Sequence, residues 1–270
     1  MVRKNYPSDL TDTEWEIIKE IMDQELHYTT GRPLEVDYRE IWNAIFYLNR
    51  TGCQWRYLPH DFPPYTTVNY HFLKWKRCGL YQKVNDTLRR QAREQAGRKA
   101  EPSAGIIDSQ SVKGTPESCE ESGVDGGQLV NGRKRHIVVD TMGYLLHVVV
   151  HAANVFDGKG ARAVLEQLYK TVKPLKKIWA DNAYRGELEE WVQETFDCVV
   201  EIVKKLRSKG FHVLPRRWVV ERTLAWLTRF RRLSKDYERK PSSSESMGYI
   251  ASIRLMLKQR GAAQSTCPVN

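Results

Sequence analysis

The sequence GIIDSQSVKG, residues 105–114, places a carboxylate directly after two β-branched apolar residues. Ile106 and Ile107 are typical of a strand that enters a buried sheet. An ionised Asp108 next to such a strand is costly unless something compensates its charge. The simpler alternative is that Asp108 is exposed to water at the end of the strand, since Asp is rarely fully buried without a partner. Other parts of the chain decide between these two explanations.

The composition is that of a globular protein. The chain has 270 residues, 41% of them apolar and eight of them Trp, which can fill the core of one large or two ordinary domains. The best apolar stretch, residues 144–153, is short and contains two His, and the N-terminus does not lead into a signal sequence. Five widely spaced Cys without a C-x-x-C pair argue against a disulfide framework and a zinc cage. We therefore expect a soluble, cytoplasmic and nucleoid-associated protein.

The charge is concentrated in one segment. The chain has 43 Lys and Arg against 33 Asp and Glu, a net charge of +10. Residues 207–240 hold eleven basic residues and only three acidic ones, interleaved with Trp218, Trp226 and Phe230. A run of charge is usually a solvated face, but an Arg-rich run with aromatic residues favours nucleic acid as the partner.

Residues 1–95 are predicted to form a small all-α domain of the helix-turn-helix type. Thr11 to Glu14 has the form of a capping box, and Asp37 can cap a second helix. A third helix, 66–77, buries apolar residues at helical spacing. Its other side carries polar and basic residues suited to a DNA major groove, although most such three-helix units bind nothing. The predicted DNA contacts on this helix are Asn69, His71, Lys74 and Arg77, beside Tyr70.

Residues 96–260 are predicted to form an α/β domain with a mixed five-stranded sheet flanked by helices. Two apolar runs, 136–140 and 144–152, are joined by turn residues and indicate an antiparallel hairpin. Further strands are expected near 107, at 176–181 and at 198–203, and helices from 157, over 216–235 and over 244–258. The strands near 107 and 179 can be parallel neighbours. Residues 261–270 are expected to be a disordered tail.

Two strands each end in an aspartate, Asp108 and Asp181. If the strands are adjacent, the two carboxylates repel unless a divalent cation neutralises them, and oxygen ligands of this kind suit Mg²⁺. Two such ions can clamp the attacking and leaving oxygens of phosphoryl transfer. Asp140 fits less well, because its strand runs the opposite way, and Asp157 is explained as a helix N-cap.

Glu221 is the only acidic residue between 202 and 235. On a helix over 216–235 it shares a polar stripe with Arg217, Thr228, Arg232 and Lys235. It could simply pair with Arg217 one turn earlier. Beside two strand-end aspartates, however, it has the character of a metal ligand flanked by phosphate-binding arginines.

The chain resembles bacterial insertion-sequence transposases of the insertion-sequence-five type, members of the DDE superfamily with an RNase H-like core. The motifs that carry the resemblance are GCQWRYLP at 52–59, DSQSVKGT at 108–115, GRKRHIVVDTMGYLL at 132–146, ADNAYRG at 180–186 and LPRRWVVERTLAWLTRFRRLSKDYE at 214–238. The resemblance implies that Asp108, Asp181 and Glu221 are catalytic and bind two Mg²⁺ ions, with Mn²⁺ able to substitute. Arg217 and Glu221 match the R-x3-E part of a superfamily signature, whereas Leu214 and Thr228 stand where a Tyr and a Lys belong.

The resemblance implies cleavage at the terminal inverted repeats of an insertion sequence and joining of the 3′-OH ends to target DNA. The expected partners are double-stranded DNA, as repeats and target, and at least a second copy of the chain. The alternatives are a DNA-binding repressor or decayed transposase without catalysis, and a nuclease that cuts without joining. The other predicted DNA contacts are a basic loop and the basic helix, comprising Arg133, Lys134, Arg135, Arg217, Arg229, Arg231, Arg232 and Lys235.

Overall fold

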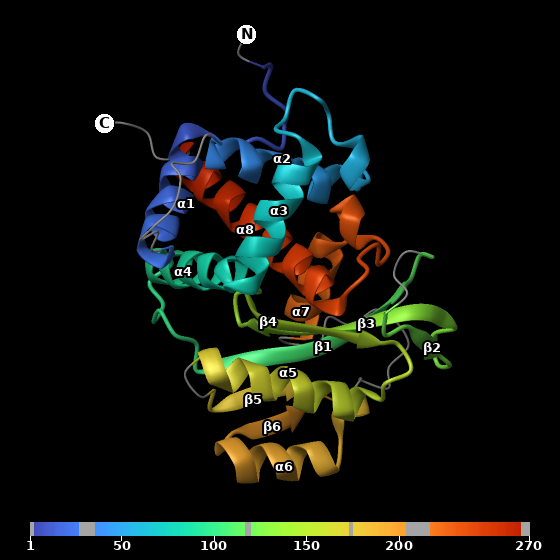
Figure 1. The fold of residues 1–270 in the computed structure, drawn as a ribbon. Helices are drawn as coiled ribbons and strands as arrows, with labels where there is room; N and C mark the ends of the chain where they lie inside the picture. Colours follow the sequence, from blue (N-terminus) through green and yellow to red (C-terminus); the bar gives the residue numbers. More distant parts are fainter. Residues whose placement is uncertain (1–2, 27–35, 117–119, 173–174, 204–216, 266–270) are drawn as a thin grey trace.

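The structure is a computed structural model that describes residues 3–26, 36–116, 120–172, 175–203 and 217–265, with side chains described to residue 260. Four N-terminal helices and the C-terminal helix form a helical layer on one side of a mixed sheet, and two further helices cover the other side (Figure 1). Within the described ranges, no helix combines the length and the apolar character needed to cross a membrane.

The N-terminal helices are α1 (Asp12–Glu25), α2 (Tyr38–Thr51), α3 (Tyr65–Arg77) and α4 (Leu80–Gln95), with a 3₁₀ turn, η1, at Trp55–Tyr57. The two predicted caps are present. Thr11 and Glu14 form a reciprocal capping box, and the Asp37 carboxylate accepts the Arg39 N–H at 2.8 Å. Gly52 ends α2 in the left-handed region, with φ at 73°, which a residue with a Cβ rarely adopts.

The sheet has six strands: β1 (Ala104–Lys113), β2 (Gly123–Asp125), β3 (Val130–Asp140), β4 (Leu145–Ala152), β5 (Lys177–Ala180) and β6 (Val199–Ile202). Its path is β2-β3-β1-β5-β6, and β4 also pairs with β3. The β3–β4 hairpin is antiparallel, as predicted, and β5 pairs in parallel with β1 and β6. The chain has the RNase H-like arrangement of three antiparallel strands followed by two strands parallel to β1. The sixth strand, β2, was not predicted.

The opening residues of β1 show how the two layers meet. Ile106 packs in the core under α7 (Arg217–Leu227) and α8 (Pro241–Ser265), while Ile107 packs in a second core with α5 (Asp157–Thr171) and α6 (Glu187–Phe196). Side chains alternate between faces along a strand. Asp108 therefore lies on the α7 face, and Ser109 lies on the α5 face.

Helix α8 joins the N-terminal helices to the sheet. It runs through the middle of the helical layer (Figure 1), and its buried Ile250, Ile253 and Leu257 belong to the same core as α1, α2 and α4. Arg254 on α8 ion-pairs with Glu14 on α1 at 2.8 Å. Because residues near both ends of the chain share one core, the division into 1–95 and 96–260 remains a prediction about sequence units.

Three local expectations differ from the structure. The helix predicted over 216–235 ends at Leu227, because the amides of Arg229 and Phe230 turn to carbonyls three residues back, and a 3₁₀ turn, η3, follows at Arg231–Leu233. Helix α8 begins at Pro241 and continues to Ser265, into the expected tail; residues 266–270 lie outside the described part. The N-cap of α5 is Phe156 rather than Asp157, whose carboxylate bonds elsewhere.

Candidate active site

The parallel register of β1 and β5 brings Asp108 and Asp181 together. Ala104 pairs with Lys177 and Ile106 with Trp179, so the same register continued by two residues sets Asp181 opposite Asp108. Asp181 follows the last residue of β5 and caps a 3₁₀ turn, η2 (Asn182–Tyr184), by accepting the Ala183 N–H at 2.8 Å. The two aspartates therefore lie side by side, as the sequence predicted. Asp181 follows its strand, but Asp108 lies within β1, which pairs with β3 as far as Lys113, so the prediction that this strand ends at Asp108 was wrong.

Helix α7 brings Glu221 and Arg217 to the same place. Its apolar face, with Val220 and Leu224, packs into the core on the sheet, which leaves Glu221 exposed toward the aspartates. The Arg217 guanidinium bridges two carboxylates, with Nη2 3.4 Å from Asp181 Oδ2 and Nε 3.2 Å from Glu221 Oε1. The simple alternative, an ion pair between Glu221 and Arg217, is present in the structure. Arg217 also pairs with Asp181, so this ion pair is part of the acidic site.

The electrostatics of Asp108 indicate that Asp181 and Glu221 lie near it. The pKa of Asp108 is raised to about 6, mainly by burial and also by the negative charges of Asp181 and Glu221, whereas the Ser109 N–H and Arg217 oppose the rise. All three carboxylates are thus close enough to act on one another. Their repulsion is the property that a bound cation would relieve.

A polar layer lies beneath β1 on the α5 face. Ser109 donates its hydroxyl proton to Asp157 at 3.2 Å, and the Lys134 ammonium donates to the same oxygen at 2.9 Å. Lys134 also lies 3.4 Å from Asp125. These contacts occupy the Asp157 carboxylate, which explains why it does not cap the helix. They also hold Ser109, the residue after Asp108, in place.

The three carboxylates are hard oxygen donors, the kind that Mg²⁺ prefers. Among the described residues, no three acidic, His or Cys side chains already converge closely enough to hold a metal ion. The Arg217 guanidinium supplies the positive charge between Asp181 and Glu221 instead. The donor chemistry fits a divalent cation, and ligation would require Arg217 to leave this position.

The basic residues of β3 have a different role from the one predicted. All residues from 132 to 140 are buried, because β3 is paired along both edges and covered on both faces. Arg133 is 0% exposed, and Lys134 and Arg135 are 6% and 5% exposed. We therefore withdraw Arg133, Lys134 and Arg135 as DNA contacts, since phosphates cannot reach them.

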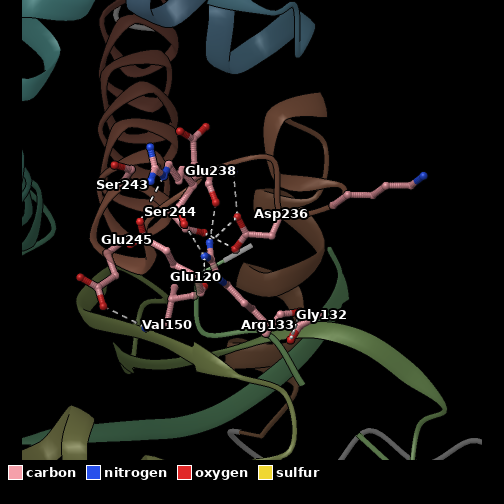
Figure 2. A network of polar contacts seen from close by, with 12 residues as sticks. Glu120, Gly132, Arg133, Val150, Asp236, Glu238, Ser243, Ser244 and Glu245 are labelled. Carbon is pink, nitrogen blue, oxygen red and sulfur yellow. Dashed lines mark hydrogen bonds and ion pairs between the residues drawn. The ribbon is translucent and has the colours of Figure 1, made fainter. Parts of the chain in front are cut away.

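Arg133 instead fixes the chain between α7 and α8 (Figure 2). It donates to Asp236 at 3.2 Å and to the carbonyls of Glu238 and Arg239, each at 2.7 Å. Asp236 in turn accepts the Ser244 hydroxyl at 2.8 Å. The sequence did contain a signal: Asp236 and Glu238 are two of only three acidic residues in the basic segment 207–240.

Other predicted DNA contacts divide by exposure. His71 is 3% exposed and packs against the rings of Tyr38 and Trp75. Arg232 is 6% exposed and ion-pairs with Glu238 at 2.6 Å. Neither residue is therefore a DNA contact. Asn69 and Lys74 are half-buried on α3. The predicted contacts that remain exposed are Arg77, Arg229, Arg231 and Lys235. Leu214 lies outside the described residues, and the Thr228 hydroxyl donates to the Ala225 carbonyl at 2.9 Å.

The sequence did not predict a groove that lies between α3 and residues 237–243. Its volume is about 1360 Å³, and Asn69, Tyr70, Arg77, Tyr237 and Lys240 are among the residues that line it. The two walls come from segments more than 150 residues apart in the chain. No local pattern could have indicated that they face each other.

Comparison with known proteins gives matches along most of the chain. Residues 99–256 match the family described as "Transposase DDE domain", and residues 10–85 match the one described as "Putative transposase of IS4/5 family". A relative from Burkholderia cepacia, "Putative transposase for insertion sequence element IS402", is 32% identical over 116 residues, which are 40% of this chain and 55% of the relative. The chain thus spans about half the length of that relative.

One solved structure, "Crystal structure of the Mos1 Strand Transfer Complex", aligns with 94% of this chain and 86% of that chain. The sequence identity is 10% and the TM-score is 0.25. A score this low adds nothing to the topology described above.

Proposed function

This chain belongs to the transposase DDE domain family, and on that premise we propose that it cleaves DNA at the terminal inverted repeats of an insertion sequence and joins the 3′-OH ends to target DNA. The reaction is metal-dependent phosphoryl transfer. The observation that carries the proposal is the meeting of Asp108, Asp181 and Glu221, from β1, the end of β5 and α7, around one position.

Each residue of the site has a role in this reaction. Asp108 and Asp181 would hold the metal ions, and Glu221 would complete the ligand set from α7. Two Mg²⁺ ions bound there, with Mn²⁺ able to substitute, would stabilise the attacking and leaving oxygens. Once Arg217 leaves the carboxylates, its planar guanidinium can pair with the scissile phosphate through two hydrogen bonds.

The exposed cations that follow α7 carry the phosphate contacts of this proposal. Arg229, Arg231 and Lys235 are exposed in the segment that leads away from Glu221. Positive side chains at such positions neutralise phosphates irrespective of sequence. The N-terminal helical region, including Asn69, Lys74 and Arg77, binds the element end. Pairing of two ends requires a second copy of the chain, and the reaction takes place on DNA of the nucleoid.

The test uses a labelled duplex that carries the DNA flanking the gene, a target plasmid and Mg²⁺. We expect wild-type protein to nick the duplex and to transfer the label to the plasmid. Asp108→Asn and Asp181→Asn should bind the duplex with wild-type affinity but produce neither product. Asp23→Asn, which changes an exposed carboxylate on α1, should retain both activities.

Three outcomes would contradict the proposal in different ways. Nicking without transfer would identify a nuclease. Binding without nicking by the wild-type protein would identify a repressor or a decayed transposase. Nicking at the wild-type rate by Asp108→Asn or Asp181→Asn would remove that residue from the site.

A further inference from the structure

The groove between α3 and residues 237–243 has an aromatic floor and a cationic rim. Tyr70 and Leu73 on α3 are 55% and 40% exposed, although both side chains have large apolar surfaces. Tyr237 lies on the opposite wall. Large exposed apolar side chains that gather in one hollow are characteristic of a binding surface.

The walls of the groove are held in place by hydrogen bonds. Arg133 bonds to the carbonyls of Glu238 and Arg239 from below, so the second wall is fixed to the sheet (Figure 2). Lys76 on α3 donates to the hydroxyls of Ser242 and Ser243 at 3.2 and 2.9 Å, which ties the two walls together. The groove is therefore preformed, and binding need not order it.

The charge of the lining selects an anionic occupant. Basic residues among the lining are Lys76, Arg77, Arg232, Arg239 and Lys240, of which Arg232 pairs with Glu238 and Arg239 with Glu120. Lys76, Arg77 and Lys240 therefore supply the positive charge of the groove. Among the described residues of the lining, the acidic one is Glu238, which is buried and neutralised by Arg232 at 2.6 Å. A hollow with aromatic faces and a basic rim matches the surfaces that bind single-stranded nucleic acid, where bases stack and phosphates follow the cations.

The position of α3 argues against a duplex in this groove. A recognition helix must stand clear of its own protein to enter a major groove about 12 Å wide. The exposed face of α3, with Asn69, Tyr70 and Arg77, instead looks across the groove at residues 237–243. Bases inside a duplex stack on each other, so their faces are not available to Tyr70.

We propose that this groove binds unpaired DNA, with a base stacked on Tyr70 and the phosphates of the strand beside Arg77 and Lys240. The inference deepens the proposed function and rests on it, because cutting one strand at an element end leaves a terminus whose partner strand can separate. Asn69 and Arg77 on α3 then contact the element end through its opened strand rather than through the base edges of an intact repeat.

The test measures the binding of a labelled 20-nucleotide oligothymidine, by fluorescence anisotropy, in EDTA. Tyr70→Ala should weaken this binding by about 5- to 150-fold, the effect of losing one stacked base. The affinity of Tyr70→Ala for a random duplex of the same length should stay within about twofold of the wild-type protein's affinity for that duplex, since phosphate contacts dominate non-specific duplex binding. Tyr70→Phe should bind oligothymidine like the wild-type protein, because the ring that stacks is retained.

The matched control is Tyr57→Ala, which removes a tyrosine that is 75% exposed and does not line the groove. Circular dichroism must show the same melting temperature for all variants. Equal effects of Tyr70→Ala and Tyr57→Ala on oligothymidine, equal losses on single strand and duplex, or no binding of oligothymidine by the wild-type protein would overturn the proposal.

Because binding is measured without metal, the proposal about the groove and the proposal about the reaction can be refuted independently. A protein that nicks and joins DNA but shows no Tyr70 effect refutes the groove alone. A protein that shows the Tyr70 effect but never nicks DNA refutes the proposed function alone.

Discussion

Replacement of Asp236 by Ala tests whether Arg133 on β3 stabilises the fold rather than binding DNA. Asp236 is fully buried, and its carboxylate accepts hydrogen bonds from Arg133, from the Glu238 amide and from the Ser244 hydroxyl. The substitution leaves the Arg133 guanidinium, also fully buried, without its counter-charge. Breaking one side of a buried ion pair costs about 3–5 kcal/mol, a large part of the roughly 5–15 kcal/mol that stabilises a typical protein.

The assay is thermal and urea unfolding followed by circular dichroism. For a chain of this size the expected loss lowers Tm by about 6–20 °C. Arg239→Ala is the matched control, because it breaks the Arg239–Glu120 ion pair of the same network, whose partners are 76% and 40% exposed. An exposed pair of this kind contributes about 0–1 kcal/mol. The double variant Arg133→Met with Asp236→Leu should regain part of the loss, because neither charge of the Arg133–Asp236 pair is then left buried without the other.

Two results would refute this reasoning. The first is a loss below about 1 kcal/mol for Asp236→Ala, within the range of an exposed pair. The second is an Arg133→Met variant of unchanged stability whose affinity for DNA has fallen. The second result would restore Arg133 as a DNA contact.

Two further predictions concern the acidic site. Arg217→Gln should bind Mn²⁺ about 2- to 30-fold more tightly in the absence of DNA, because the metal ion no longer competes with two ion pairs worth about 0.2–1 kcal/mol each. Cleavage should fall, because the contact of Arg217 with the phosphate is lost; unchanged Mn²⁺ affinity by calorimetry would contradict this prediction. Burial raises the pKa of Asp108 to about 6, so the carboxyl gains a proton as the pH falls through 6, and a metal ligand must be deprotonated. Mn²⁺ affinity should therefore be about tenfold lower at pH 5 than at pH 7, and equal affinities at both would show that Asp108 is not a ligand.

The parts of the fold that follow from short-range patterns could be predicted from the sequence. The capping box at Thr11, the Asp37 cap and the β3–β4 hairpin each depend on residues close together in the chain. The approach of Asp108 to Asp181 was also predictable, because the two strands concerned are parallel neighbours. The end of the first strand was not, since β1 continues past Asp108 to Lys113 by pairing with β3.

The parts that were missed depend on partners far away in the chain. Arg133 was interpreted as part of a surface loop, because its partner Asp236 lies 103 residues later. A basic residue in a central strand looks the same in the sequence as one on the surface until its acidic partner is known. The end of α7 at Leu227 and the burial of Arg232 have the same origin, since Arg232 turns inward to Glu238 and to the Cys53 carbonyl. Arg232, in the basic segment 207–240, was therefore wrongly predicted to contact DNA.

The most direct test of the acidic site is a crystal structure with Mn²⁺, located by its anomalous scattering. The account predicts a peak at ligand distance, about 2.0–2.6 Å for hard divalent cations, from carboxylate oxygens of Asp108 and Asp181, with the Arg217 guanidinium moved away from Asp181. A peak elsewhere, or crystals grown in Mn²⁺ that keep Arg217 paired with Asp181 and Glu221 and show no peak between the acids, would contradict it.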